Sequence, residues 1–335
     1  MTEPQAGAEG AEPSDAVPVV PLGPTDGAVG RATFRDPQRQ ARFARDGFVV
    51  VDLLDATGIA ALRRVWAEDG GSARPGFHYG LAADGPERRR AVDRAVRPIV
   101  GPAVAELFDD HVIFLASFVT KAPGDDGEVG EHADWTFVDE QHAVTAGLWA
   151  PLQDCAVDDG ALVVVPGSHR FRPTLRGTPD LGLDFDLVRP LPDRLRRPVP
   201  LRAGQAVVFD HRLLHGSPVN RGTDVRVAVG VGVKPREVQL LHHTRTGPGL
   251  AARYEISTDH LLDAPFGQRP AGTPVALVAH DPRPVSPREL AIAVADHRAR
   301  TGSSGRRAAR AMARRLARLA GRSAEPTSAG GAGPG

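Results

Sequence analysis

Cysteine, lysine and long apolar segments are scarce in this chain of 335 residues. Its single cysteine, Cys155, excludes an intramolecular disulfide and a cysteine-based zinc cluster, and it fits a reducing compartment. No uninterrupted apolar run approaches the length needed to span a bilayer, and the N-terminal residues have neither the basic nor the apolar region of a secretory signal. We therefore expect a soluble, cytoplasmic protein with no membrane segment.

An excess of charge of either sign is also absent, because 41 Lys and Arg residues balance 41 Asp and Glu residues. Lysine itself occurs only at Lys121 and Lys234, so arginine carries nearly all of the positive charge. A net charge of zero gives no reason to expect a nucleic-acid partner or a membrane surface. The apolar share of 41% is enough for a substantial core.

The two ends of the chain differ in composition from its middle. Residues 1–30 are rich in Ala, Gly, Pro and acidic residues without a periodic apolar face, which predicts disorder. Residues 306–322 place Ala, Met and Leu on one face and Arg on the other, which predicts a basic helix before a Gly/Ala-rich tail. We favour a solvated helix over an anchor for nucleic acid or anionic lipid, because the apolar face is largely Ala. The expected division is a disordered segment 1–30, one domain 31–300, and the basic helix and tail 301–335.

Helical periodicity precedes strand-like patterns within the predicted domain. Expected helices cover 36–46, 55–69, 86–108 and 287–300, and Pro98 and Pro102 divide the third of these into two consecutive helices. Runs rich in β-branched residues predict strands at 48–51, 112–120, 143–152, 161–165, 206–209 and 225–233. This order indicates a mainly β fold, a barrel or sandwich with flanking helices.

A candidate half-site for a metal lies at Glu131-His132-Ala133-Asp134-Trp135. If this segment is a strand, His132 and Asp134 project to the same face, since residues i and i+2 do so. Two ligands hold a metal weakly, so a third must come from elsewhere in the chain. The candidates are His111, His142, His169, His211, His215, His242 and His243.

His215 has the most informative surroundings among these candidates. It follows the predicted strand at 206–209 and precedes a Gly-Ser-Pro turn that leads into a strand carrying Arg226. Two His and one carboxylate are the ligand set of non-haem Fe(II) oxygenases, and also of zinc hydrolases. Arg226 favours the oxygenase, because a guanidinium binds a carboxylate such as that of 2-oxoglutarate through two parallel hydrogen bonds.

At this point the sequence resembles the phytanoyl-CoA dioxygenase family of Fe(II)/2-oxoglutarate-dependent oxygenases. The similar stretches span roughly residues 40–240 and follow the order and spacing of the family motifs. They are His132-Ala133-Asp134, Leu148-Trp149-Ala150-Pro151-Leu152-Gln153-Asp154, Asp159-Gly160-Ala161-Leu162 through Pro166-Gly167-Ser168-His169, Gly204 to Phe209, His215-Gly216-Ser217 with Asn220, and Arg226.

The resemblance implies a double-stranded β-helix, the jelly-roll or cupin-type barrel, with a metal at its open end. It implies that His132, Asp134 and His215 bind Fe(II), and that Arg226 holds the distal carboxylate of 2-oxoglutarate. Trp149 and Ser217 then fall at the 2-oxoglutarate pocket, while His169 belongs to a structural turn. Weaker candidates for contact with the substrate are Lys121, Trp135 and Phe137.

The implied reaction consumes O2 and 2-oxoglutarate, releases succinate and CO2, and hydroxylates an unactivated C–H of a small molecule. We expect this molecule to belong to secondary metabolism. Asp134 argues against halogenation, because related halogenases lack this carboxylate; desaturation, epoxidation and cyclisation remain alternatives. Outside this class, a zinc-dependent hydrolase or a non-catalytic cupin-like binding protein could use the same His/Asp/His site.

Overall fold

The structure is a computed structural model that describes residues 17–21, 31–71, 74–171, 175–178, 181, 191–280, 286–297 and 299. The predicted basic helix at 306–322 and most of the segment 1–30 lie outside these residues. The division of the chain at residues 30 and 300 therefore stays a prediction.

A six-stranded antiparallel sheet forms the centre of the fold. Its strands in spatial order are β2 (Phe48–Asp52), β9 (Gln205–Asp210), β6 (Ala146–Pro151), β11 (Arg226–Pro235), β4 (His111–Lys121) and β3 (Phe77–Tyr79). Residues alternate between two covered faces along β11, since Val227, Val229 and Val231 pack in one apolar cluster and Ala228 packs in another. A strand buried on both faces reads as a continuous apolar run, which is why the sequence predicted these strands well.

A second, four-stranded sheet lies against the inner face of the first. Its order is β5 (Val129–His132), β10 (His215–Ser217), β7 (Val163–Val164) and β8 (Arg197–Pro198). Side chains of both sheets meet in one cluster, in which Trp149 and Val207 of the large sheet join Val164 of the small one. Two facing antiparallel sheets connected in this way are the predicted double-stranded β-helix, and the fold prediction is confirmed.

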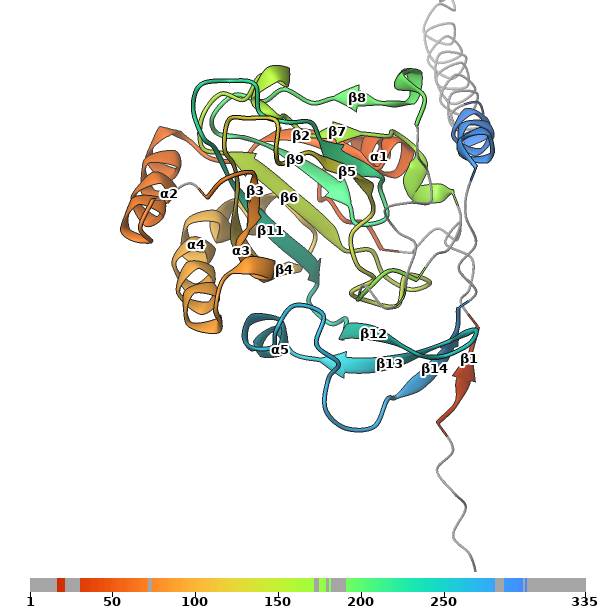
Figure 1. The fold of residues 1–335 in the computed structure, drawn as a ribbon. Coiled ribbons are helices and arrows are strands. Elements are labelled where there is room, and N and C mark those ends of the chain that lie inside the picture. Colours follow the sequence, from red (N-terminus) through yellow and green to blue (C-terminus); the bar gives the residue numbers. More distant parts are fainter. Residues whose placement is uncertain are drawn as a thin grey trace, which may run out of the picture.

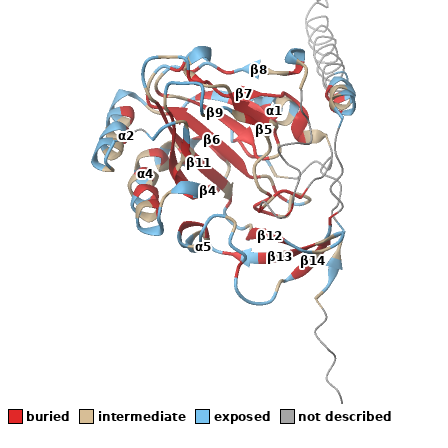
Figure 2. Ribbon diagram, in the orientation of Figure 1, coloured by how far each residue is buried: buried red, intermediate tan, exposed pale blue. Residues whose placement is uncertain are grey.

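Helices cover the outer face of the large sheet. These are α2 (Ala56–Glu68) and α4 (Pro86–Leu107), with α1 (Pro37–Asp46) at the β2 end and the short α3 (Gly80–Ala83) after β3. Figure 1 shows α2 and α4 on one side of the sheet, and Figure 2 shows the central strands buried beneath them. Asp36 and Asp55 cap α1 and α2 by accepting hydrogen bonds from Arg39 N and Gly58 N.

The prediction of two helices between residues 86 and 108 is wrong, because α4 runs unbroken through Pro98 and Pro102. Both prolines are exposed. The carbonyl groups that lose their helical partners can therefore bind water on the outer side. The opposite face buries Val92, Val96, Val100 and Val104 at a spacing of four residues, and this packing outweighs the missing hydrogen bonds.

A third sheet is formed by residues outside the stretch of roughly 40–240 that carries the family motifs. It consists of β1 (Val19–Val20), β14 (Ala276–Ala279), β13 (Leu250–Ile256) and β12 (Leu240–Gly247), and α5 (Thr258–Asp263) follows β13. Val19 and Val20 pair with Leu277 and Val278, so residues 19–20 depart from the predicted disorder of 1–30 because they complete a sheet edge. Residues 287–297 are helical, as predicted. None of the described helices has the length and apolar character needed to cross a bilayer.

Candidate metal centre

Pairing of β5 with β10 brings two histidines together. His132 is the register partner of His215, and their ring centroids lie 4.5 Å apart. The Asp134 Oδ1 atom lies 3.8 Å from His132 Nε2 and 3.9 Å from His215 Nε2. One ligand atom from each residue lies within 4.8 Å of the other two, and this is the one such cluster of three or more potential ligands in the described part of the chain.

The two imidazole rings are oriented by the backbone. His132 Nδ1 lies 2.9 Å from the carbonyl oxygen of Gly130, and His215 Nδ1 lies 3.0 Å from that of Leu213. A carbonyl oxygen can only accept, so each Nδ1 carries the proton and each Nε2 presents a lone pair toward Asp134. Metal-binding histidines are fixed in this way by a hydrogen bond from their second ring nitrogen. The three residues therefore fit a divalent metal.

The protonation states also suit a metal. Burial, followed by the neighbouring His215, lowers the pKa of His132 to about 4, so this ring is neutral at physiological pH. Burial alone would raise the pKa of the Asp134 carboxyl, but His215, His211 and His132 together lower it below its ordinary value. Metal ligands must be deprotonated to bind, and these two are.

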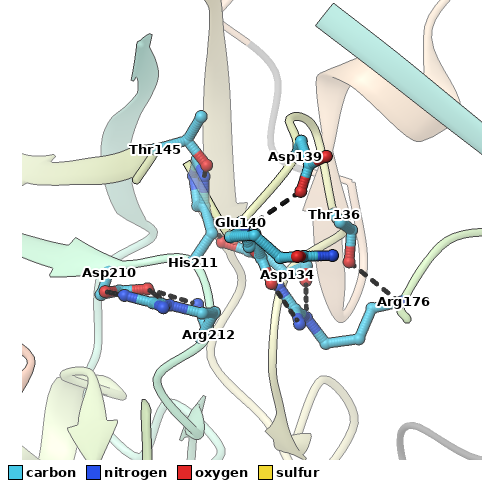
Figure 3. A network of polar contacts seen from close by, with 10 residues as sticks. Asp134, Thr136, Asp139, Glu140, Thr145, Arg176, Asp210, His211 and Arg212 are labelled. Carbon is cyan, nitrogen blue, oxygen red and sulfur yellow. Dashed lines mark hydrogen bonds and ion pairs between the residues drawn. The ribbon is translucent and has the colours of Figure 1, made fainter. Parts of the chain in front are cut away.

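Asp134 does not lie on the strand that carries His132. β5 ends at His132, and Asp134 follows in an irregular segment. The expected strand geometry of i and i+2 is therefore wrong, although the side chains still meet. Arg176 fixes the segment instead, because its Nε donates to the Asp134 carbonyl oxygen at 2.6 Å and its guanidinium pairs with Glu140 (Figure 3).

Arg226 is a buried cation without an acidic partner in the described chain. Its side chain is 1% exposed, Nη1 donates to the carbonyl oxygen of Gly160 at 3.0 Å, and Nε and Nη2 have no hydrogen-bond partner. The guanidinium lies 4.9 Å from the ring centroid of Trp149. Burial lowers the pKa of Arg226 to about 10, which leaves it charged. The alternative of an ion pair with Asp224 or Asp210 is not found. An unpaired buried guanidinium indicates a missing anion.

Lys121 lies beside this arginine, since Lys121 and Arg226 are register partners in β4 and β11. Its Nζ donates to Ser217 Oγ at 2.5 Å and to the carbonyl oxygens of Ser217 and Pro218 at 3.0 and 2.5 Å. Burial, followed by the Arg226 charge, lowers the pKa of Lys121 to about 7. Lys121 thus lies beneath Ser217, and its contact with a substrate stays a prediction.

One cavity of about 510 Å³ connects these groups. Its walls include the metal-ligand cluster, Arg226, Ser217 and Trp149, and also Trp135 and Phe137. Gly230 and Gly232 of β11 also line this cavity on the large sheet. His169 lies elsewhere, with Nε2 on the carbonyl oxygen of Ala44 at 3.2 Å, in the structural turn expected for it.

His211, one of the candidates for the third ligand in the sequence, lies beside Asp134 but outside the cluster of three ligands. Its Nδ1 lies 2.7 Å from Thr145 Oγ1, and its Nε2 lies 3.7 Å from Asp134 Oδ2, the oxygen that does not face the other histidines (Figure 3). Burial lowers the pKa of His211 to about 4. Its position four residues before His215, across a chain reversal, was the available signal.

Comparison with known proteins identifies relatives of this chain. A model of the phytanoyl-CoA dioxygenase family matches residues 32–228, more than half of the chain. A phytanoyl-CoA dioxygenase of Arabidopsis thaliana is 31% identical over 128 residues, 36% of this chain and 44% of the relative. A phytanoyl-CoA dioxygenase domain-containing protein 1 of Danio rerio is 33% identical over 116 residues, 32% and 40% of the two chains. The matches thus span less than half the length of these two relatives.

Solved structures give weaker similarity. EvdO2 from Micromonospora carbonacea var. aurantiaca, complexed with 2-oxoglutarate, has a TM-score of 0.42 and 18% identity over 61% of this chain and 93% of that one. The α-ketoglutarate-dependent epimerase SnoN from nogalamycin biosynthesis has a TM-score of 0.44 and 22% identity over 71% and 95%. With TM-scores below 0.5, these similarities do not define the function.

Proposed function

Because this chain belongs to the phytanoyl-CoA dioxygenase family, we propose that it is an Fe(II)- and 2-oxoglutarate-dependent dioxygenase. It hydroxylates an unactivated C–H of a small molecule and releases succinate and CO2. The observation that carries this proposal is the pairing of two features in one cavity: the His132, Asp134 and His215 cluster, and the unpaired guanidinium of Arg226. The guanidinium favours the dioxygenase over a hydrolytic zinc site, because it suits the distal carboxylate of 2-oxoglutarate.

His132, Asp134 and His215 would hold the metal, and three protein ligands would leave coordination positions for 2-oxoglutarate and O2. Bound iron, with 2-oxoglutarate and O2, supplies the oxidising chemistry. The protein's own part is placement. His132 and His215 present lone pairs fixed by carbonyl groups, and Asp134 adds one negative charge.

Arg226 binds the distal carboxylate of 2-oxoglutarate through its unpaired Nε and Nη2 atoms in this proposal. Lys121 acts at the same end of the cavity, where the distal carboxylate would bind. Because Lys121 Nζ donates to Ser217 Oγ, the hydroxyl proton of Ser217 is left to donate to that carboxylate. The Trp149 ring, beneath the guanidinium, keeps water from this end of the cavity.

Trp135 and Phe137 are proposed substrate contacts, since both line the cavity beside Asp134. A small molecule of secondary metabolism, rather than a nucleic acid or a membrane lipid, is the proposed partner. We also place the protein in the cytoplasm, in line with Cys155 being buried as a free thiol.

The test is O2-dependent formation of succinate from 2-oxoglutarate by the Fe(II)-loaded protein. We expect succinate with Fe(II), much less with Zn(II), and none from Asp134→Ala. Asp125→Ala is the matched control, since this carboxylate is 99% exposed and lies outside the cavity. Equal turnover of a substrate under nitrogen would point to the zinc hydrolase instead, and ligand binding without any turnover would point to a binding protein.

A further inference from the structure

The substrate end of the cavity carries an aromatic wall, and the described residues that line this end include no Lys or Arg. Resting on the function proposed above, we propose that the substrate is an uncharged ring compound that packs against the stacked pair of Trp135 and Phe266, and that anionic acyl thioesters of coenzyme A do not bind.

The wall consists of two stacked rings from distant parts of the chain. Trp135 and Phe266 have ring centroids 4.4 Å apart and planes inclined by 27°. Trp135 is also in contact with His242, edge to face at 5.6 Å, and with Phe137 at 6.3 Å. Phe266 is 42% exposed, an unusual state for a large apolar side chain at a cavity. An exposed aromatic face at a cavity fits a ring that packs on it.

Arg89 keeps this wall in place. Its guanidinium is buried in α4, and Nη1 donates to the carbonyl oxygens of Leu261 and Ala264 at 3.3 and 2.7 Å. These two carbonyls mark the end of α5 and the start of the segment that carries Phe266. The wall is therefore preformed, which lowers the entropic cost of binding.

The charges around the cavity exclude an anionic substrate. Arg226 is the one permanently positive residue among the described residues that line the cavity. In the proposed function, its charge is paired with the distal carboxylate of 2-oxoglutarate. The cations near the wall already have partners within the protein. Arg176 pairs with Glu140 and Arg253 with Asp139, while Arg89 Nη1 donates to two carbonyl oxygens and Arg269 Nε donates to the Tyr254 hydroxyl. In the proposed complex, Asp134 and the 2-keto carboxylate of 2-oxoglutarate would balance the two positive charges of Fe(II). An ionised group buried here would lack a counter-ion, which is strongly unfavourable.

Neutral polar groups complete the substrate end. The Tyr79 phenol opens onto the cavity, and burial followed by the Asp134 charge raises its pKa, so it stays a proton donor. His242, His260 and Gln268 also line this end. Such groups recognise hydroxyl or carbonyl oxygens on a ring without requiring charge.

Two fluorescent probes with the same rings test the inference. N-phenyl-1-naphthylamine is uncharged, and 8-anilino-1-naphthalenesulfonate adds one sulfonate. Both are titrated into the full chain with Fe(II) and saturating 2-oxoglutarate without O2, so that Arg226 is occupied. We expect the neutral probe to bind at least about tenfold more tightly. Equal or tighter binding of the sulfonate, or displacement of the neutral probe by decanoyl-CoA, would overturn the inference.

Substitutions of Phe266 and Gln268 test whether the probes bind at the aromatic wall. Phe266→Ala should weaken binding of the neutral probe roughly three- to tenfold, while Phe266→Tyr, which keeps the ring, should not. Gln268→Lys should admit the sulfonate probe, whereas the same substitution at exposed Gln38, outside the cavity, should not. Unchanged binding in Phe266→Ala, or no gain in Gln268→Lys, would contradict the assignment.

The visible absorption of the Fe(II)–2-oxoglutarate complex separates this inference from the function on which it rests. A normal band together with no preference for the neutral probe overturns the inference and leaves the dioxygenase intact. A missing band overturns both.

Discussion

Arg226 carries a charge in the protein interior and binds one carbonyl oxygen, that of Gly160. Its pKa is lowered by burial, so the charged form costs free energy that only a bound anion offsets. Arg212 serves as a comparison, because this arginine has an acidic partner, the buried carboxylate of Asp210. The two arginines should therefore respond in opposite ways to the same substitution.

Arg226→Met should weaken 2-oxoglutarate binding by about 100-fold or more, since two charge-assisted hydrogen bonds are lost. The free energy of unfolding without ligand should rise by about 1 kcal/mol, because an unpaired buried charge is removed. Arg212→Met should instead lower it by about 3 kcal/mol, because Asp210 is left buried and unpaired. Calorimetric titration and urea denaturation measure these changes. Destabilisation of Arg226→Met, with unchanged affinity, would contradict the assigned role.

The motifs predicted which residues meet at the metal centre, but not how they meet. Short motifs specify His132, Asp134 and His215, and the structure brings these together. The contact of His211 with Asp134 depends on the chain reversal between β9 and β10, which no local pattern encodes. The exposed position of the Phe266 ring could not be predicted from the sequence either, because Phe266 lies in a segment without a recognisable motif.

At the scale of elements, Gly216 sets the distance between β10 and β5. A Cβ atom there would lie 2.6 Å from the carbonyl oxygen of Val129, and a backbone atom cannot move aside as a side chain can. Adjacent His215 pairs with His132 across the same two strands. A side chain at position 216 must therefore push the two histidines apart.

Gly216→Ala should weaken metal binding by about tenfold or more, because small displacements of ligands are costly at a metal site. Gly247→Ala is the control, since a Cβ at that position meets no atom within 4 Å. Titration with Co(II) and absorption spectroscopy measures the affinity of both variants. Equal affinity in Gly216→Ala and the unmodified protein would show that the strands tolerate the change.

Elements were predictable where local pattern and packing agree, as in β2, β4, β6 and β11. Elements could not be predicted where tertiary packing outweighs a local sequence preference. Helix α4 continues through its two prolines because its row of valines is buried. Strand β1 forms because it can pair with the edge of β14. In both cases a contact distant in sequence decides the outcome.

The whole molecule should lose stability in mild acid because several histidines are buried neutral. Burial is the first cause that lowers the pKa of His132, His169 and His211 to about 4, from 6.5 for the free side chain. Below pH 6.5 the unfolded chain binds protons at these sites, and the folded chain does not until about pH 4. The free energy of unfolding therefore falls as the pH drops through this window, by about 1.4 kcal/mol per pH unit for each fully titrating site.

Urea denaturation at pH 7 and at pH 5 measures this loss. In His169→Gln, which lies outside the metal centre, the difference between the two pH values should shrink because one site is removed. Equal unfolding free energies at pH 7 and pH 5 in the unmodified protein would mean that these histidines are not buried in their neutral form.

The central claim is that His132, Asp134, His215 and Arg226 form one site for Fe(II) and 2-oxoglutarate. Anaerobic titration of Fe(II) into the protein with 2-oxoglutarate, followed by visible absorption, tests it most directly. We expect a weak charge-transfer band that saturates at equimolar iron, disappears in His215→Ala and persists in His169→Gln. No band in the unmodified protein, or an unchanged band in His215→Ala, would contradict the claim.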